Sequence, residues 1–577
     1  MENAPEPTHE TKLRQQSEEI KMDAENTKAF FRGKLALRSP RRASIAVIGA
    51  GASALSFARE VEEGRLSNIE MIIFEKNAGV GGTWWENRYP GCACDIPSHN
   101  YQYTWAPNPN WSQYYSGSTE IRHYFERVVE KYGLNKYIKL RHEVIESKWL
   151  EQQRQWSITV KTNSTDTITV VVDFLINGGG IVNKWKWPNI PGLSSYKGTI
   201  MHSAHWDEKR DVNDKSVVVI GNGSSGVQIT ASLAKVVRTM TVVMRSPTWI
   251  TPGFASSFAG PGGTNFQYSE IQKEEFRRNP EKYLAYRKSI EEELNKRQNF
   301  FIKGSLEQVL AKRFSQEMMN NGLATKPELA KKMIPSFDVG CRRPTPGIGY
   351  LEALSQKNVD VSWGTPQRLT QSSIVLHDGT EIRPDAIICA TGFDISYKPR
   401  FPIIGRNGLR LDEYWSPDAK AYMSFAVPNF PNYLHYLGPA TAASHGSLIP
   451  VIEQLTNYFV KIIDKTQREG YSSFEPRQEC VQDLDRHHQE YLQHTVWSSD
   501  CASTFKNGTK DGRINLLHGG SRLHYLEMLR NPRWEDYVWT LLPGVRLYDF
   551  FGNGRSLSQD EGGDLTWYLE NPSMAHL

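Results

Sequence analysis

The sequence predicts an α/β protein with two Rossmann-like dinucleotide-binding domains and a helical insertion. Two short apolar runs, at 44–48 and 215–220, each lead directly into a glycine-rich turn, at 49–54 and 221–226. This succession is typical of the first strand and phosphate-binding loop of a parallel-sheet domain. A charge-rich stretch at 268–333 has helical character and predicts a solvated cap. With 577 residues, the chain is also too long for one hydrophobic core.

The composition excludes several classes of protein. The chain is 39% apolar and 23% charged, and its net charge of +4 comes without a basic stripe, so we expect no nucleic-acid partner. No stretch approaches the roughly 20 apolar residues that cross a bilayer. Residues 1–42 are polar, lack the apolar core of a secretory signal, and predict a mobile arm with some helix around 11–32. We therefore expect a cytoplasmic protein.

The six cysteines are scattered, with neither the spacing of a zinc site nor a CxxC redox pair. Only Cys92 and Cys94 are close in sequence. We expect all six to be reduced and to serve packing, which agrees with a reducing compartment.

The first glycine turn has the pattern Gly49-x-Gly51-x-x-Ala54 and opens a predicted helix. The first glycine permits the tight turn, the second lets the backbone approach a pyrophosphate, and the small third residue lets the helix pack on its strand. The next predicted strand, at 69–76, runs into Glu75, whose carboxylate can accept hydrogen bonds from ribose hydroxyls. This order of elements predicts a nucleotide site: a strand, a glycine turn, a helix, and a second strand that ends at an acidic residue.

A long segment rich in Gly, Pro and aromatic residues follows at 79–105. Loops of this length inside compact domains are usually functional. Asp95, the isolated acid at its centre, is either a functional carboxylate or one that caps a turn. We expect a helix at 119–135 and a small β-meander with a return strand between 138 and 177.

The second turn, at 221–226, has the full G-x-G-x-x-G pattern. The strand after it ends on Arg245, with Ser246 beside it, where the first unit has Glu75. An acid there accepts a hydrogen bond from the ribose 2′-hydroxyl, whereas arginine suits a 2′-phosphate. The second nucleotide is therefore expected to be NADPH rather than NADH.

Further along the chain, Arg342 and Arg343 form a pair between glycine and proline residues. They are either surface charges or anion-binding groups on a loop. Strands are predicted at 358–363 and 373–377, and a helix begins near Pro450.

Two dinucleotide folds in one chain suggest electron transfer between a flavin and a nicotinamide. A disulfide reductase would need a nearby pair of redox cysteines, which the sequence lacks, and a simple dehydrogenase would need only one nucleotide. A monooxygenase fits both sites, and it requires a fixed positive charge that can hold an anionic flavin peroxide.

Several motifs resemble those of the type I Baeyer–Villiger monooxygenases, a group of class B flavoprotein monooxygenases. The family signature is matched at Tyr196, Gly198, His202, Trp206 and Asp207, with only the first position changed, from Phe to Tyr. A second family pattern, Gly-Gly-x-Trp followed by Tyr-Pro-Gly and Asp, is matched from Gly81 to Asp95. The family's Ala-Thr-Gly turn is matched at 390–392. The segments GCRRPTPGIGYLEAL and NPRWEDY resemble a branch from fungal secondary metabolism that acts on polyketides and terpenoids.

The resemblance implies FAD and NADPH as cofactors, O₂ and a small-molecule ketone as substrates, and an ester or lactone as product. Arg343 matches the family's active-site arginine, which stabilises the flavin peroxide, and Asp95 matches the acid that positions it. Arg342 stands at the family's lysine position near the NADPH 2′-phosphate. We expect His202 and Trp206 to couple two domains rather than to contact substrate.

The expected binding residues fall into two sets. The set for FAD is Gly49, Gly51, Ala54, Glu75, Gly82, Thr83, Trp84, Asp95, Tyr101 and Val144. The set for NADPH is Gly221, Gly223, Ser224, Ser225, Gly226, Arg245, Ser246 and Arg342. The expected domains are an N-terminal arm (1–42), an FAD domain in two parts (43–185 and 391–577) and an NADPH domain (186–390) with its helical insertion at about 265–333.

One departure from the family concerns a mobile loop. Family members carry a tryptophan there, within Ser-Trp-Tyr, that contacts the bound nicotinamide nucleotide, and the matching positions here are Ser503, Thr504 and Phe505. Either Trp497 substitutes from nearby or the loop closes differently.

Two alternatives to ketone oxygenation stay open. The same flavin chemistry could oxygenate sulfur or nitrogen, or perform another oxidation. The chain could instead be a flavin-binding protein without oxygenase activity that serves a partner enzyme. The sequence indicates neither the identity of the substrate nor whether the protein is a monomer or a dimer.

Overall fold

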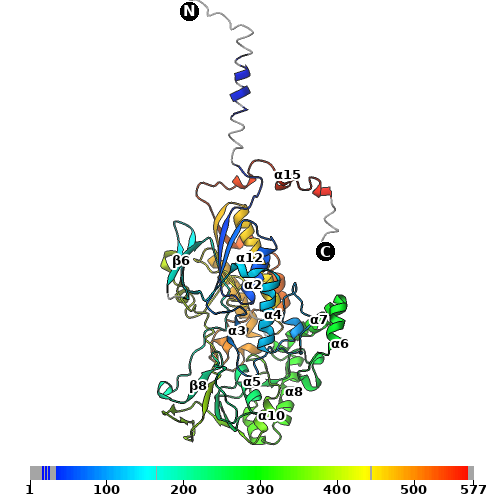
Figure 1. The fold of residues 1–577 in the computed structure, drawn as a ribbon, viewed down its shortest axis with the longest axis vertical. Helices are drawn as coiled ribbons and strands as arrows, with labels where there is room; N and C mark the ends of the chain where they lie inside the picture. The colour runs from blue at the N-terminus through cyan, green and yellow to red at the C-terminus, as the bar shows by residue number, and fades with distance from the viewer. Residues whose placement is uncertain are drawn as a thin grey trace, which may run out of the picture.

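The computed structural model describes residue 14 and residues 16–18, 20–22, 24–25, 34–163, 166–441 and 445–569. Most of the helix predicted around 11–32 lies outside the described residues. Two five-stranded parallel sheets form the centre of the molecule (Figure 1). The predicted α/β fold with two Rossmann-like units is confirmed.

The first sheet combines strands from both halves of the chain. In spatial order, it consists of β19 (Tyr433–His435), β7 (Phe174–Asn177), β1 (Ala43–Ile48), β2 (Ile69–Glu75) and β3 (Ile138–Leu140). Every pair is parallel, and β1 is buried on both faces. Ile45 and Val47 join the core cluster that contains residues of the helices 52–62 and 449–468, whereas Ala46 and Ile48 join a separate cluster with strand residues between 144 and 160. The helix α2 (Ala52–Glu62) meets α12 (Ile449–Arg468) through a hydrogen bond of 3.0 Å between the hydroxyls of Ser56 and Thr456.

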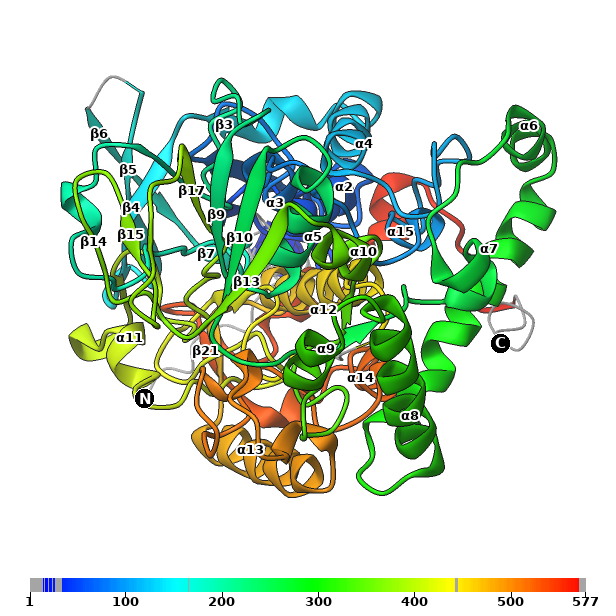
Figure 2. The same cartoon turned by 90° about the horizontal axis from the view of Figure 1, so that it is seen from below.

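The second sheet is also entirely parallel. It consists, in spatial order, of β13 (Val359–Trp363), β10 (Thr239–Met244), β9 (Ser216–Ile220), β17 (Ala386–Cys389) and β8 (Thr199–His202). Figure 2 shows β9, β10 and β13 side by side, with α5 (Ser224–Leu233) and α10 (Tyr350–Ser355) next to them. The segment 196–207, which carries the family signature, therefore belongs to this sheet, since its residues 199–202 form the edge strand β8.

Smaller sheets flank the two large ones. The predicted meander is confirmed by β4 (Glu143–Leu150), β5 (Gln155–Lys161) and β6 (Thr167–Val172), which pair antiparallel, with β18 (Ile403–Ile404) beside β4. A three-stranded sheet contains β14 (Arg368–Leu369), β15 (Ile374–Val375) and β16 (Glu381–Ile382). Two pairs complete the strands, β11 (Ile250–Thr251) with β12 (Thr345–Pro346), and β20 (Tyr471–Pro476) with β21 (Tyr537–Leu541).

The predicted helical insertion is confirmed and contacts the loop that carries Asp95. Its helices are α6 (Glu270–Arg278), α7 (Pro280–Asn295), α8 (Leu306–Gly322) and α9 (Pro327–Met333). His99 is buried among four aromatic rings of the insertion, and its Nδ1 lies 2.8 Å from the Tyr283 hydroxyl. Further α-helices among the described residues are α3 (Thr83–Glu86), α4 (Ser118–Lys131), α11 (Leu411–Tyr414), α13 (Gln478–Gln493), α14 (Arg522–Met528) and α15 (Leu557–Glu561).

Two chain segments cross between the large sheets, one after β7 and one after β17. They lie against each other, because Trp185 and Phe393 form an antiparallel bridge and the Asp394 N–H donates to the Lys184 carbonyl at 2.7 Å. A change in the orientation of one large sheet relative to the other would move these two segments, because the chain runs between the sheets through them.

The expectation that all six cysteines are reduced is wrong for two of them. Cys341 and Cys501 form a disulfide, with their Cα atoms 6.4 Å apart across 160 residues of sequence. Pairing at this distance depends on tertiary structure, so spacing in the sequence could not reveal it. Cys92, Cys94 and Cys389 are free and buried, as expected of packing residues, and Cys480 is free and half-buried.

Among the residues that the structure describes, no helix combines the length and apolar character needed to span a membrane. Within the same residues, no cluster of three or more His, Cys, Asp or Glu side chains is arranged to hold a metal ion.

Candidate cofactor and active site

A cavity of about 530 Å³ opens at the carboxyl end of the first sheet, where ligands bind in open α/β sheets. Most of the predicted FAD residues line it: Gly49, Gly51, Glu75, Gly82, Thr83, Trp84, Tyr101 and Val144. Ala54 and Asp95 are not among its lining residues. Ala54 is fully buried, as expected of the small third residue that lets the helix pack on its strand.

The glycines of this cavity form a cradle for a phosphate. A Cβ atom at Gly82 would lie 3.1 Å from the Cα atom of Gly51, so side chains would crowd this approach. Gly51 precedes α2, whose first N–H groups receive no side-chain cap. Free N–H groups at a helix N-terminus attract an anion, so this geometry suits a pyrophosphate.

Glu75 ends β2 at the wall of the same cavity and is 3% exposed. Its two carboxylate oxygens accept hydrogen bonds from the backbone N–H groups of Ala50, at 2.8 Å, and Asn77, at 2.7 Å. Burial raises the pKa of Glu75, and these two N–H groups partly offset the rise. Each oxygen keeps lone-pair capacity for a ribose hydroxyl.

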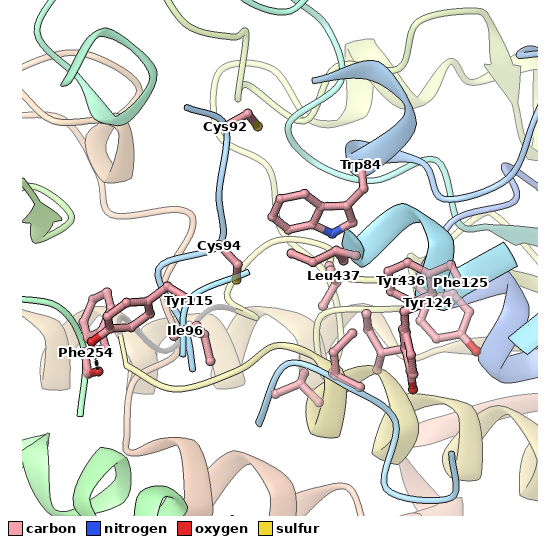
Figure 3. Packing of buried hydrophobic residues seen from close by; sticks show 14 of the residues in the cluster. Trp84, Cys92, Cys94, Ile96, Tyr115, Tyr124, Phe125, Phe254, Tyr436 and Leu437 are labelled. Atoms are coloured by element: carbon pink, nitrogen blue, oxygen red, sulfur yellow. Dashed lines mark hydrogen bonds between the residues drawn. The ribbon is translucent and has the colours of Figure 1, made fainter. Parts of the chain in front are cut away.

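The indole of Trp84 forms part of the cavity wall. Its Nε1 donates to the Tyr101 hydroxyl at 3.1 Å, which fixes the ring plane. Figure 3 shows this indole close to Leu437, which lines the same cavity. A rigid apolar wall of this kind suits a planar ring system.

The structure brings together Arg343 and Asp95, which are 248 residues apart. The two side chains form a bidentate ion pair, in which Arg343 Nη2 donates to Asp95 Oδ1 at 2.9 Å and Nη1 donates to Oδ2. Arg343 lies just before β12, and its guanidinium lies 5.6 Å from the centre of the Phe254 ring. A planar guanidinium held by two parallel bonds has a fixed orientation.

The charge of Asp95 controls the protonation of its partner. Burial alone would lower the pKa of Arg343, but the Asp95 charge and hydrogen bonds outweigh it, and the net pKa is raised. The Arg343 side chain nevertheless stays 43% exposed. Arg343 is therefore a permanent positive charge with one accessible face.

Another cavity, of about 260 Å³, lies between Asp95 of this ion pair and the helix that follows the second nucleotide turn. Asp95 and Ser224, at the start of α5, both line it. Gln228 ties the two sides together, since it accepts from the Tyr89 hydroxyl at 2.8 Å and donates to the Ala93 carbonyl at 3.0 Å. The sequence pattern assigns no role to Gln228, because only the tertiary packing of α5 reveals this contact.

The second turn has the close packing that its glycines predict. A Cβ atom at Gly226 would lie 2.1 Å from the Gly221 carbonyl oxygen, and one at Gly221 would lie 2.4 Å from that of Ala390. At Gly223 nothing lies within 4 Å, and α5 begins at Ser224 and Ser225 with no side-chain cap. Open N–H groups therefore face outward at this helix end.

Arg245, Ser246 and Arg342 gather beside α5. Arg342 Nη1 donates to the Ser246 hydroxyl and to the Pro247 carbonyl, both at 3.1 Å. Burial lowers the pKa of Arg342, and the neighbouring Arg245 charge lowers it further. Two like charges this close repel each other, and an anion bound between them relieves the repulsion.

The signature residues lie away from the ion pair. The Tyr196 ring covers Gly198, since a Cβ atom there would lie 2.5 Å from the tyrosine hydroxyl. His202, at the end of β8, lies 3.3 Å from the Thr391 hydroxyl and stacks on Trp185 at 4.7 Å. Trp206 is buried, and Asp207 pairs with Arg210 at the surface. His202 thus contacts both segments that cross between the sheets.

The predicted mobile-loop positions show how the departure from the family is accommodated. Thr504 is exposed at the start of a short 3-10 helix. Trp497 is fully buried and stacks on Phe301 at 5.0 Å, within a hydrophobic cluster. Trp497 therefore serves packing here and leaves no free indole face for a cofactor.

Sequence comparisons relate the chain to flavin-dependent monooxygenases. A family model described as flavin-binding monooxygenase-like matches residues 42–259. The chain is 35% identical to the FAD-binding monooxygenase tazF of Aspergillus terreus over 92% of this chain and 95% of the relative. It is 30% identical to a Baeyer–Villiger monooxygenase of Streptomyces coelicolor over 85% of this chain and 92% of the relative.

Solved structures agree in fold. The closed crystal structure of cyclohexanone monooxygenase superposes with a TM-score of 0.76 at 24% identity, covering 87% of this chain and all of that chain. The cyclohexanone monooxygenase of Rhodococcus sp. Phi1 bound to NADP⁺ gives a TM-score of 0.75 at 22% identity, with the same coverage. The chain therefore belongs to the family of FAD-binding monooxygenases that includes the Baeyer–Villiger monooxygenases.

Proposed function

We propose that this protein is an FAD-dependent, NADPH-consuming monooxygenase. It inserts one oxygen atom from O₂ next to a ketone carbonyl and produces an ester or lactone. The observation that carries the proposal is the Arg343–Asp95 ion pair, whose Asp95 lines a cavity together with Ser224 of the second nucleotide turn. Residues 43–185 and 391–577 are assigned to FAD binding, and residues 186–390 to NADPH binding.

The residues present fit both cofactors. The glycine cradle at Gly51 and Gly82, with Glu75 at the end of β2, would hold the pyrophosphate and ribose of FAD. The N-terminus of α5, together with Arg245 and Arg342, would hold the phosphates of NADPH. When both are bound, NADPH supplies a hydride and the reduced flavin activates O₂.

The chemical task of the chain is to stabilise negative charge next to the flavin. Arg343 offers its accessible face to an anionic oxygen, and Asp95 keeps the guanidinium from rotating away. The Phe254 ring, 5.6 Å from the Arg343 guanidinium, provides an apolar surface on one side of the pair and strengthens the electrostatic attraction there.

The substrate class is a further proposal. The segments GCRRPTPGIGYLEAL and NPRWEDY support a bulky polyketide or terpenoid ketone.

The test is to incubate the FAD-loaded protein with NADPH and a panel of cyclic and bulky ketones, followed by mass spectrometry. A product one oxygen heavier than its ketone, absent with Arg343→Ala, supports the proposal. NADPH oxidation that yields only hydrogen peroxide with every ketone would contradict it.

A further inference from the structure

The Cys341–Cys501 disulfide lies at the junction of the site and a distant chain segment. Cys341 directly precedes Arg342 and Arg343, whereas Cys501 belongs to the segment 499–506. Both cysteines are buried, with exposures of 0% and 2%. The bond therefore fixes the backbone from which both site arginines extend.

Polar contacts cross the same junction. Arg342 Nε donates to the Ala502 carbonyl at 2.9 Å, so the residue after Cys501 orients this guanidinium. The Ser499 hydroxyl donates to Asp338 Oδ2 at 2.7 Å. Within the segment, Lys506 Nζ donates to the Ser499 carbonyl at 2.8 Å.

These contacts link the disulfide to the anion-binding group. The guanidinium that donates to Ala502 also donates to Ser246 at 3.1 Å, next to Arg245. If the segment 499–506 moves away, Arg342 loses the carbonyl that fixes its Nε. Its long side chain then gains rotamer freedom, which must be lost again whenever an anion binds.

We propose that the Cys341–Cys501 disulfide is a redox-controlled latch that positions Arg342 for the 2′-phosphate of NADPH. In the oxidised state, the covalent bond holds the segment 499–506 against the arginine loop. A dithiol reductant opens the latch when the segment 499–506, whose Asp500 and Thr504 are exposed, moves aside and uncovers the buried sulfurs. Two exchange steps then convert the disulfide into two thiols and the dithiol into its own disulfide, with electrons and protons balanced. The inference rests on the proposed NADPH site.

A purely structural disulfide would give a different result. A covalent link across 160 residues lowers the conformational entropy of the unfolded chain. It therefore raises the stability of the folded protein without favouring one nucleotide. A latch that acts through Arg342 changes the affinity for NADP⁺ but not for NAD⁺, which lacks the 2′-phosphate. The ratio of the two affinities therefore separates the two roles.

The experiment measures binding of NADP⁺ and NAD⁺ to the FAD-loaded protein by titration calorimetry. It compares the oxidised protein, the protein reduced with dithiothreitol, and the double variant Cys341→Ser, Cys501→Ser. Cys480→Ser is the matched control, because Cys480 is a free cysteine outside the latch. Thiol counts in denaturant should give four for the oxidised protein and six after reduction, since two of the six cysteines form the bond.

We expect reduction and the double variant to weaken NADP⁺ binding by about 10-fold and to leave NAD⁺ binding unchanged. This factor corresponds to the loss of one charge-assisted hydrogen bond. Reoxidation should restore NADP⁺ affinity in the wild type and in Cys480→Ser. Equal NADP⁺ affinity in both redox states would overturn the latch, as would a disulfide that is reduced only on unfolding. If neither state prefers NADP⁺ to NAD⁺, the NADPH assignment fails as well.

Discussion

At the scale of single residues, the site depends on two charged groups from distant loops. Asp95 comes from the aromatic loop after β2 and Arg343 from the loop before β12, and their bidentate contact gives the guanidinium one orientation. Asp95 also raises the pKa of Arg343 against the effect of burial. Each residue alone is ambiguous in the sequence, and the contact between them supports the proposed anion-stabilising role.

Replacing Asp95 with asparagine should disturb this orientation and little else. The amide has one acceptor oxygen and no charge, so Arg343 loses one of its two parallel bonds. We expect ester formation to slow by about 10- to 100-fold, somewhat less than the loss of a whole oxyanion-stabilising donor. Product analysis and NADPH consumption should show a larger share of hydrogen peroxide. Wild-type rates of ester formation in this variant would rule out a positioning role for Asp95.

The preference for NADPH should depend on Arg245. Removing this guanidinium with Arg245→Ala takes away a charge-assisted contact to the 2′-phosphate, which has a typical strength of about 1.5–3 kcal/mol. The KM for NADPH should rise by about 10- to 100-fold, while the KM for NADH stays near its wild-type value. Arg210→Ala, at a surface ion pair next to β8, is the control. A wild-type protein that uses NADH as well as NADPH would contradict this assignment.

At the scale of elements, the signature segment supports the connection between the two sheets. β8 is the edge strand of the second sheet, and His202 at its end touches Thr391 and Trp185 on the two crossing segments. Gly198 allows the Tyr196 ring to fold over the start of this strand, where its hydroxyl donates to the Pro384 carbonyl at 3.1 Å. The motif therefore stabilises a junction rather than the reacting atoms.

Gly198→Ala should destabilise this junction through a steric clash. The new Cβ would lie 2.5 Å from the Tyr196 hydroxyl, and displacing that ring costs its hydrogen bond. We expect a loss of about 1–3 kcal/mol in the free energy of unfolding, typical of overpacking. The same change in a Tyr196→Ala background should cost clearly less. Equal losses in both backgrounds, measured by urea unfolding, would disprove the clash.

The sequence predicted those elements whose signals are local. The strand, glycine turn and helix around Gly49, and those around Gly221, were predictable from neighbouring residues. In each case an apolar run stands directly before a turn that only small residues can form. The partnership of β19 with β7, the edge position of β8 and the Cys341–Cys501 bond were missed, because each joins segments far apart in sequence. The Arg343–Asp95 contact was expected only through resemblance to a family, since no periodicity or spacing relates the two loops.

At the scale of the whole molecule, folding buries several histidines in their neutral form. His435, at the wall of the first cavity, and His488, on α13, each have a pKa lowered from 6.5 to about 4, mainly by burial. Burial likewise lowers the pKa of His445 to about 4. Protonating any of these rings in the folded protein would place a charge where solvent cannot stabilise it.

Stability should therefore fall as the solution becomes more acidic. Between pH 6.5 and about 4, these histidines bind protons in the unfolded chain but not in the folded one. The free energy of unfolding therefore becomes smaller as pH drops, and the folded protein is less stable. Each ring contributes up to about 3 kcal/mol across this interval. Urea unfolding at pH 7.5, 6 and 5 should show the decline, and His488→Gln should make it shallower. A flat profile over this range would contradict the neutral burial of these rings.

The central claim is that the two nucleotide sites and Arg343 act together to transfer oxygen to a ketone. The most direct measurement uses ¹⁸O₂ with the FAD-loaded protein, NADPH and a ketone from the panel, and determines the isotope in the product by mass spectrometry. With the wild type, we expect an ester or lactone that carries one ¹⁸O atom. With Arg343→Ala, we expect NADPH oxidation without labelled product. Unlabelled ester, or equal labelling by both proteins, would contradict this claim.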